Sequence, residues 1–218
     1  MTDRKRVAIV ISGRGSNMAA LIAAAKEPTY PAEIVLVVSN RPGAPGLERA
    51  AEAGIATDVV DHKAFPDRPS FETALTARLE TARVDLVCHA GFMRIVTEGY
   101  VEHWRDRLIN IHPSLLPAFP GLHTHENALA AGVKLHGCTV HFVRTEVDAG
   151  PIIAQAAVPV VEGDTPDTLA ARVLTAEHRL YPLALALVAS GQARVVDETV
   201  RISGTSSGSG MLIAPAAI

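Results

Sequence analysis

Short apolar runs alternate with amphipathic stretches along the first half of the chain. The run over residues 7–11 is continuously apolar, as expected for a strand buried on both faces of a parallel sheet. Four further strand-like runs follow, and stretches with the apolar spacing of helices separate them. The predicted strands cover residues 7–11, 34–39, 57–60, 84–90 and 108–112, and the predicted helices cover residues 18–25, 46–53, 71–82 and 98–104. This alternation predicts an α/β fold with a Rossmann-like, doubly wound, mostly parallel sheet.

The pattern changes after residue 112. Two strand-like runs over residues 137–143 and 152–160 are joined by a short turn, which predicts an antiparallel hairpin added to the parallel sheet. A short helix is expected over residues 126–131 and a long helix over residues 166–189. A final hairpin is expected over residues 193–202. We therefore expect a single domain over residues 1–203, with halves of about 1–105 and 106–203, and a flexible tail over residues 204–218.

Two helix starts have recognisable caps. Ser70 is the expected N-cap of the helix over residues 71–82. Thr165 is the expected N-cap of the long helix, because Pro166 and Asp167 suit a first helical turn.

Composition narrows the class of protein. The chain has 218 residues, of which 48% are hydrophobic, and a net charge of −3, so its charge gives no support for a nucleic-acid partner. No segment is long and apolar enough to span a membrane. Cys88 and Cys138 lie inside apolar runs and form no paired motif, which is typical of buried thiols in a reducing compartment. We therefore expect a cytoplasmic protein with no nucleic-acid or membrane partner.

The strongest candidate chemistry lies at the end of the strand over residues 108–112. Asn110 and His112 are two residues apart, so they share one face of that strand, and a proline-rich loop follows them. Ligands bind at the carboxyl ends of strands in open α/β sheets. An amide can donate to a developing oxyanion, and an imidazole can donate or move protons near neutral pH. The alternative is that both side chains only satisfy local hydrogen bonds.

A glycine-rich loop follows the first strand. Residues 12–17 (SGRGSN) join the strand to a helix, and such a helix N-terminus can hold an anion with its unpaired N–H groups. The loop is neither a dinucleotide fingerprint nor a Walker loop. The alternative is a tight turn in which Ser16 or Asn17 caps the helix.

Asp148 is a third candidate, because a carboxylate in a turn between two strands can reach the histidine at a strand end. Such a carboxylate fixes the tautomer of the imidazole and favours its charged form. The alternative is ordinary turn chemistry, since Asp is common before such turns.

Two rival functions remain open from the residues alone. His123 and His125 form a His-x-His pair like that of some zinc hydrolases, which gives a metal-dependent hydrolase as one alternative. A non-enzymatic nucleotide-binding module is the other, and it would use the glycine loop but leave Asn110, His112 and Asp148 without a role.

Six motifs, in this order and spacing, resemble the phosphoribosylglycinamide formyltransferase family over roughly residues 6–202. They are residues 12–17 (SGRGSN), 90–95 (AGFMRI), 110–117 (NIHPSLLP), 120–125 (PGLHTH), 137–143 (GCTVHFV) and 148–151 (DAGP). The resemblance implies a formyltransferase fold. It also implies transfer of the formyl group of 10-formyltetrahydrofolate, as co-substrate, to the amine of glycinamide ribonucleotide in purine biosynthesis.

The resemblance also implies roles for individual residues. The catalytic residues would be Asn110, His112 and Asp148, acting on a tetrahedral intermediate without a metal. Residues for the ribonucleotide would be Gly15, Ser16, Asn17, Pro113 and Glu177. Residues for the folate would be Arg68, Met93, Arg94, Ile95, Val96, Arg144, Thr145, Glu146 and Val147. The N-terminal half would then bind the phosphate, and the C-terminal half would hold the folate and the catalytic groups.

Three further expectations follow from the resemblance. The peptide bond before Pro117 should be cis. Arg14 adds a positive charge near the phosphate, whereas Ala118 offers no cationic contact where the family has a Lys or Arg. The related formyltetrahydrofolate deformylase, a hydrolase, remains the main alternative, and the chain is expected to be a monomer or a homodimer.

Overall fold

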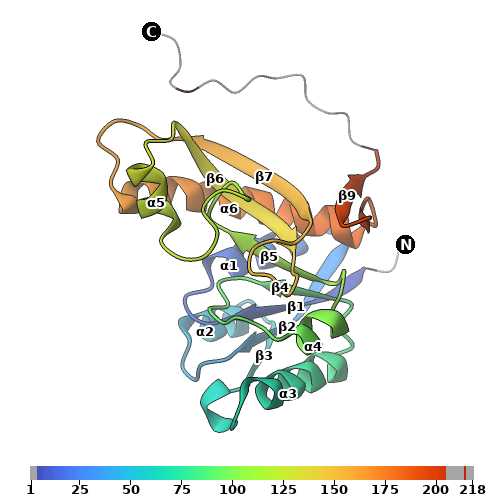
Figure 1. Cartoon of the computed structure of the whole chain (residues 1–218). Coiled ribbons are helices and arrows are strands. Elements are labelled where there is room, and N and C mark those ends of the chain that lie inside the picture. The colour runs from blue at the N-terminus through green and yellow to red at the C-terminus, as the bar shows by residue number, and fades with distance from the viewer. Residues whose placement is uncertain (1–3, 205–213, 215–218) are drawn as a thin grey trace.

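One mixed sheet of seven strands forms the centre of the molecule. The computed structural model describes residues 4–204 and residue 214 (Figure 1). The strand order is β3-β2-β1-β4-β5-β6-β7. The strands are β1 (Lys5–Ile11), β2 (Ala32–Ser39), β3 (Ala56–Val59), β4 (Leu86–His89), β5 (Leu108–His112), β6 (Leu135–Phe142) and β7 (Ile152–Pro159). Strands β1 to β5 pair in parallel, and β6 and β7 pair antiparallel, so the predicted fold class is confirmed.

Helices cover both faces of this sheet. They are α1 (Ser16–Ala25), α2 (Pro45–Glu52), α3 (Arg68–Thr81), α4 (Glu98–His103), α5 (Thr124–Ala130) and α6 (Pro166–Ala189), with a short 3₁₀ helix η1 (His62–Ala64). A separate hairpin of β8 (Ala193–Val196) and β9 (Thr199–Ile202) follows α6, as predicted. No helix in the described residues is long and apolar enough to cross a membrane.

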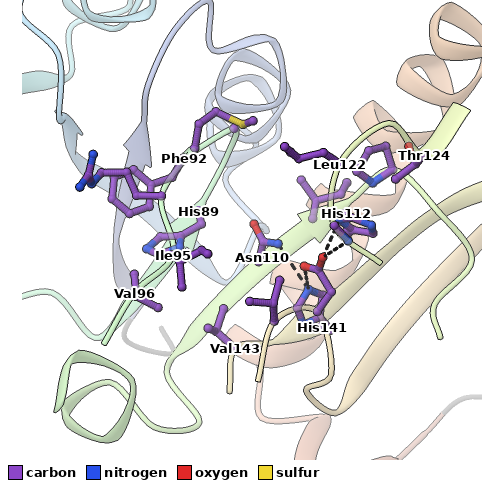
Figure 2. Close-up of a pocket in the computed structure, with 18 of the residues that line it drawn as sticks. His89, Phe92, Ile95, Val96, Asn110, His112, Leu122, Thr124, His141 and Val143 are labelled. Carbon is purple, nitrogen blue, oxygen red and sulfur yellow. Dashed lines mark hydrogen bonds and ion pairs between the residues drawn. The ribbon is translucent and has the colours of Figure 1, made fainter. Parts of the chain in front are cut away.

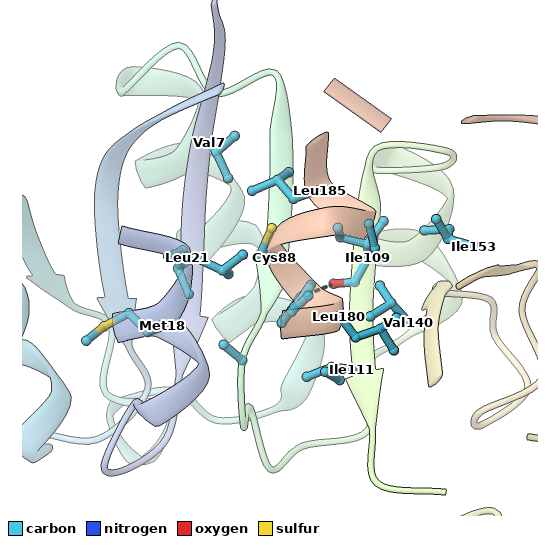
Figure 3. Packing of buried hydrophobic residues seen from close by; sticks show 14 of the residues in the cluster. Val7, Met18, Leu21, Cys88, Ile109, Ile111, Val140, Ile153, Leu180 and Leu185 are labelled. Carbon is cyan, nitrogen blue, oxygen red and sulfur yellow. Dashed lines mark hydrogen bonds between the residues drawn. The ribbon is translucent and has the colours of Figure 1, made fainter. Parts of the chain in front are cut away.

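Alternate residues of β1 contribute to two separate cores. Val7 and Ile9 pack with Leu21 of α1 and Leu185 of α6 on one face (Figure 3). Ala8 and Val10 pack on the other face with Phe71 and Leu75 of α3 and with Trp104, which follows α4. Because β1 is buried on both faces, its sequence is continuously apolar.

The predicted cap of one helix is wrong, and the cap given as the alternative reading for another helix is not formed. Helix α3 begins at Arg68, and its N-cap is Asp67, whose side chain accepts a hydrogen bond from the Ser70 amide at 2.8 Å. Pro69 therefore lies in the first turn, where its missing N–H costs nothing. Helix α1 is capped by Gly15 in the left-handed conformation (φ 68°), so neither Ser16 nor Asn17 is its N-cap.

The other predictions tested here agree with the structure. Thr165 caps α6 through a capping box with Thr168, and the Leu116–Pro117 peptide is cis. The predicted tail over residues 204–218 lies outside the described residues, apart from residues 204 and 214.

Candidate active site

A cavity of about 710 Å³ opens at the carboxyl ends of β4 and β5. Its walls come from the loop after β4, the loop after β5, the loop between β6 and β7, and α6 (Figure 2). The predicted site residues that line it are Asn17, Met93, Arg94, Ile95, Val96, Asn110, His112, Pro113, Arg144, Thr145, Val147, Asp148 and Glu177. Four others do not line it, namely Gly15, Ser16, Arg68 and Glu146.

Asn110 is held by a histidine on the neighbouring strand. The register of β5 and β6 places Asn110 opposite His141, and the Asn110 Nδ2 donates to His141 Nε2 at 3.3 Å (Figure 2). The other ring nitrogen, Nδ1, donates to the Phe142 carbonyl at 2.9 Å. A ring that donates from Nδ1 and accepts at Nε2 is neutral. Burial lowers the pKa of His141, which agrees with this assignment.

His112 lies between two acceptors at the end of β5. Its Nδ1 lies 3.4 Å from Asp148 Oδ2, and its Nε2 donates to the Phe119 carbonyl at 3.0 Å. The side chains of His112 and Asp148 are 7% and 12% exposed, so solvent screens their interaction only weakly. The Asp148 carboxylate also accepts from the Gly121 amide at 2.8 Å, which ties it to the loop after β5.

The loop that carries Asp148 is closed tightly at its base. Asp148 has a left-handed backbone (φ 56°), a conformation that Asp tolerates better than most residues. A Cβ atom on Gly150 would lie 1.7 Å from the Phe142 carbonyl oxygen, so only glycine fits there. The Phe142 amide donates to the Pro151 carbonyl at 2.9 Å. The sequence from Asp148 to Pro151 therefore sets where the carboxylate points.

The glycine loop packs closely against α2. The Gly46 amide donates to the Gly13 carbonyl at 3.1 Å, and a Cβ on Gly46 would lie 2.4 Å from Ile11 Cδ1. Asn17 points away from the loop, and its Nδ2 donates to Glu177 Oε2 at 2.7 Å. Burial raises the pKa of Glu177, although the hydrogen bond from Asn17 opposes that shift.

Three exposed apolar side chains, from the loop after β4 and the loop between β6 and β7, also line the cavity, and we call them the apolar wall. Met93, Ile95 and Val147 are 63%, 59% and 48% exposed, which is unusual for side chains of this kind. Arg94 lies over the Phe71 ring, with its guanidinium carbon 5.8 Å from the ring centroid. This wall suits a flat, largely apolar ligand.

No role was predicted from the sequence for two of the histidines that line the cavity, His89 and His141. His141 lies inside the predicted strand over residues 137–143, and only its register opposite Asn110 gives it a place in the site. His89 ends β4, where its ring lies 4.7 Å from that of Phe92 and 6.0 Å from that of Tyr100. Its position at the end of a strand was the feature of the sequence that could have identified His89 as a site residue.

His89 should make folding stability sensitive to acid. Burial lowers the pKa of His89 from 6.5 to about 3. Between these values the unfolded chain binds a proton that the folded chain does not, so stability falls as the pH falls. His89→Phe should therefore reduce the slope of the free energy of unfolding against pH by about 1.4 kcal/mol per pH unit. Urea unfolding at several values between about pH 6 and pH 4 measures that slope.

The matched control for this prediction is His103→Phe. His103 ends α4, and its side chain is 41% exposed. His89→Phe should have a smaller slope than the control, and equal slopes for the two variants would contradict the assignment.

The His-x-His pair does not form a metal site in the described part of the chain. His123 is exposed and lies 3.5 Å from Glu126, while the His125 ring packs edge-on against His136, with centroids 5.3 Å apart. No group of three or more His, Cys, Asp or Glu residues within residues 4–204 could hold a metal ion.

Comparison with known proteins identifies the class. Residues 5–185 match the formyl transferase family, and the chain therefore belongs to the formyl transferase family.

Individual relatives narrow the comparison. The chain is 44% identical to phosphoribosylglycinamide formyltransferase of Escherichia coli, over 91% of this chain and 93% of that protein. It is 56% identical to the trifunctional purine biosynthetic protein adenosine-3 of Drosophila pseudoobscura pseudoobscura over 89% of this chain. The chain spans only 14% of the length of that relative and 19% of its chicken counterpart. These names confirm the resemblance seen in the six motifs.

Solved structures agree with this comparison. Glycinamide ribonucleotide transformylase 1 of Symbiobacterium toebii superposes with a TM-score of 0.89 at 48% identity, covering 91% of this chain and 94% of that chain. A formyltetrahydrofolate deformylase of Burkholderia mallei has a TM-score of 0.83 at 28% identity, covering 92% of this chain and 70% of that one. The deformylase structure is thus less similar to this chain than the transformylase structure is.

Proposed function

We propose that this chain transfers the formyl group of 10-formyltetrahydrofolate to the amine of glycinamide ribonucleotide in purine biosynthesis. The observation that carries the proposal is the meeting of Asn110, His112 and Asp148 on the floor of one cavity, with hydrogen-bonding groups on one side and an apolar wall on the other. The formyl transferase relatives support the same reaction.

The reaction needs a site that stabilises negative charge on the formyl oxygen. Attack of the substrate amine on the formyl carbon gives a tetrahedral intermediate with charge on that oxygen. The Asn110 Nδ2 carries two hydrogens, and His141 accepts only one of them, so the other is available to the oxygen. His112 is the second donor. Asp148 holds the His112 ring and, through water, helps move a proton from the amine to the departing folate nitrogen.

The hydrogen bond between His112 and the Phe119 carbonyl must break before His112 can donate to the formyl oxygen. The Phe119 carbonyl accepts the hydrogen bond from His112 Nε2 at 3.0 Å. The mechanism therefore requires the formyl oxygen to replace this carbonyl as the acceptor when substrates bind.

Glu177 and Asn17 support a ribonucleotide acceptor. Two buried polar side chains, one in the middle of α6 and one in the first turn of α1, face the cavity and are joined by a hydrogen bond of 2.7 Å. A buried carboxylate of this kind suits a ligand that offers hydroxyl groups, such as a ribose. A hydrolase that uses water as acceptor would have no use for this pair.

The folate is assigned to the apolar wall of Met93, Ile95 and Val147. Arg68 is exposed at the start of α3 and lies outside the cavity lining, so its contact would be with a tail of the folate that extends from the cavity.

The proposal includes a division of the chain into a phosphate-binding half and a folate-binding half. Glu177 is an exception, because it lies in the C-terminal half but is assigned to the ribonucleotide. We also propose that residues 1–203 form a single domain. We propose a cytoplasmic location, because the two cysteines are free and buried, as is typical of a reducing compartment.

An absorbance assay for release of the folate product tests the proposal. Release should depend on glycinamide ribonucleotide and should be unaffected by a metal chelator. Release in the absence of the ribonucleotide would favour the deformylase alternative, and loss of activity with chelator would favour the metal hydrolase.

A further inference from the structure

Arg144 lies at the start of the loop that carries Asp148, and its guanidinium group is paired with acceptors of the protein itself. The Arg144 side chain is only 12% exposed. Its Nη2 donates to Asp106 Oδ1 at 2.7 Å, its Nε donates to Glu198 Oε2 at 2.7 Å, and its Nη1 donates to the Val143 carbonyl at 3.1 Å. A guanidinium whose three nitrogens all have protein acceptors is poorly placed to bind an anionic ligand.

Glu198 connects that loop to two other parts of the chain. Its second oxygen, Oε1, accepts from Arg105 Nη2 at 2.6 Å, and Arg105 also pairs with Glu102 of α4 at 2.7 Å. Charges of alternating sign thus link α4, the β8–β9 turn and the start of the loop between β6 and β7. We call the pairs of Glu198 with Arg144 and Arg105 the Glu198 bridge. A single exposed ion pair contributes little, but a connected network with one buried member contributes more.

The backbone of the β8–β9 turn is strained to present this side chain. Asp197 and Glu198 both have left-handed conformations, with φ of 49° and 55°. Two-residue hairpin turns of this kind favour Asn-Gly or Asp-Gly, so Glu is an unfavourable choice at the second position. The hydrogen bond from Arg144 holds the pKa of Glu198 below its usual value, as expected for a carboxylate kept charged.

We propose that the Glu198 bridge is a positioning device that fixes the Asp148 loop through Arg144. Arg144 and Val147 line the cavity, and Asp148 lies four residues after Arg144, so a shift of the loop start moves both the folate wall and the catalytic carboxylate. The C-terminal hairpin, which lies outside the cavity lining, thereby controls the folate side of the site. This role in catalysis rests on the proposed formyl transfer, whereas the effect on the loop itself does not.

Glu198→Gly separates positioning from stability. Glycine relieves the strained conformation but removes both ion pairs, so the melting temperature should stay within about 4 °C of wild type. Asp197→Gly is the matched control. It relieves the same kind of strain in the same turn, and within the described residues Asp197 makes no ion pair or side-chain hydrogen bond.

Steady-state kinetics should distinguish the two variants. For Glu198→Gly, kcat/KM for 10-formyltetrahydrofolate should fall about tenfold, with a higher KM for the folate and a lower kcat. KM for the ribonucleotide should be unchanged, because Asn17 and Glu177 belong to other elements. Asp197→Gly should behave as wild type. Equal kinetics for the two variants would overturn the proposal.

Hydrogen exchange in the unliganded protein gives a readout that needs no activity. Amides of residues 143–149 should exchange faster in Glu198→Gly than in wild type or Asp197→Gly, while those of β1 stay unchanged. Unchanged exchange in the loop would overturn the proposed role of the Glu198 bridge even if formyl transfer is confirmed. Faster exchange in a protein without formyl transfer would support the bridge and reject the proposed function.

Discussion

Asn110→Ala is expected to lower kcat about a hundred- to a thousandfold, which is the usual cost of losing one oxyanion donor. Asn110 donates from the floor of the cavity, and the structure fixes its amide through His141 at 3.3 Å. Because the donated bond strengthens only as charge develops on the formyl oxygen, substrate binding should change little. Single-turnover kinetics with both substrates would separate kcat from binding.

The control for this variant is Asn127→Ala. Asn127 is an exposed asparagine in α5 whose side chain donates a hydrogen bond to the Leu122 carbonyl at 3.4 Å. It should keep near-normal turnover and stability. If Asn110→Ala also keeps near-normal turnover, Asn110 is not an oxyanion donor.

Asp148→Asn is expected to lower kcat about a hundredfold or more, the scale of general acid–base catalysis. The substitution preserves the size of the side chain and an oxygen that can accept from the Gly121 amide. It removes the negative charge 3.4 Å from His112 Nδ1, so the ring loses the partner that holds its proton. KM values for both substrates should stay within about threefold, since the loop geometry is retained.

Glu146→Gln provides the matched control on the same loop. Glu146 is exposed, lies two residues before Asp148, and does not line the cavity. It should keep the wild-type kcat, and any change should be confined to KM for the folate, which the resemblance implies that Glu146 contacts. Equal losses for the two variants would indicate a general effect of charge on the loop and would contradict a specific role for Asp148.

Much of the fold could be predicted because strands buried on both faces have a distinctive pattern. Residues 7–11 are apolar at every position, and the structure shows why, since Val7 and Ile9 face one core while Ala8 and Val10 face the other. The change to antiparallel pairing after residue 112 was also predictable, because a short turn joins two strand-like runs.

Details that depend on tertiary contacts could not be predicted. Gly15 caps α1 because α2 approaches the loop so closely at Gly46, a contact absent from any local pattern. Asp67 competes with Ser70 as the cap of α3, and the sequence offers both residues at suitable positions. Propensity alone does not decide between such candidates.

The candidate site shows the same limit. Asn110 and His112 could be found because a two-residue spacing places them on one face of a strand. His141 could not, since its role depends on the register of β5 and β6. Arg144 was expected to bind the folate as part of its loop. Arg144 does line the cavity, and the structure shows in addition that its guanidinium contacts Asp106 and Glu198, the latter 54 residues away in sequence.

Following a ¹³C-labelled formyl group from 10-formyltetrahydrofolate by NMR tests the central claim most directly. With purified protein, chelator and glycinamide ribonucleotide, the account predicts that the label appears in the N-formyl group of the ribonucleotide, and that Asn110→Ala slows this appearance. Label recovered as free formate, at a rate independent of the ribonucleotide, would show that water is the acceptor and would contradict the account.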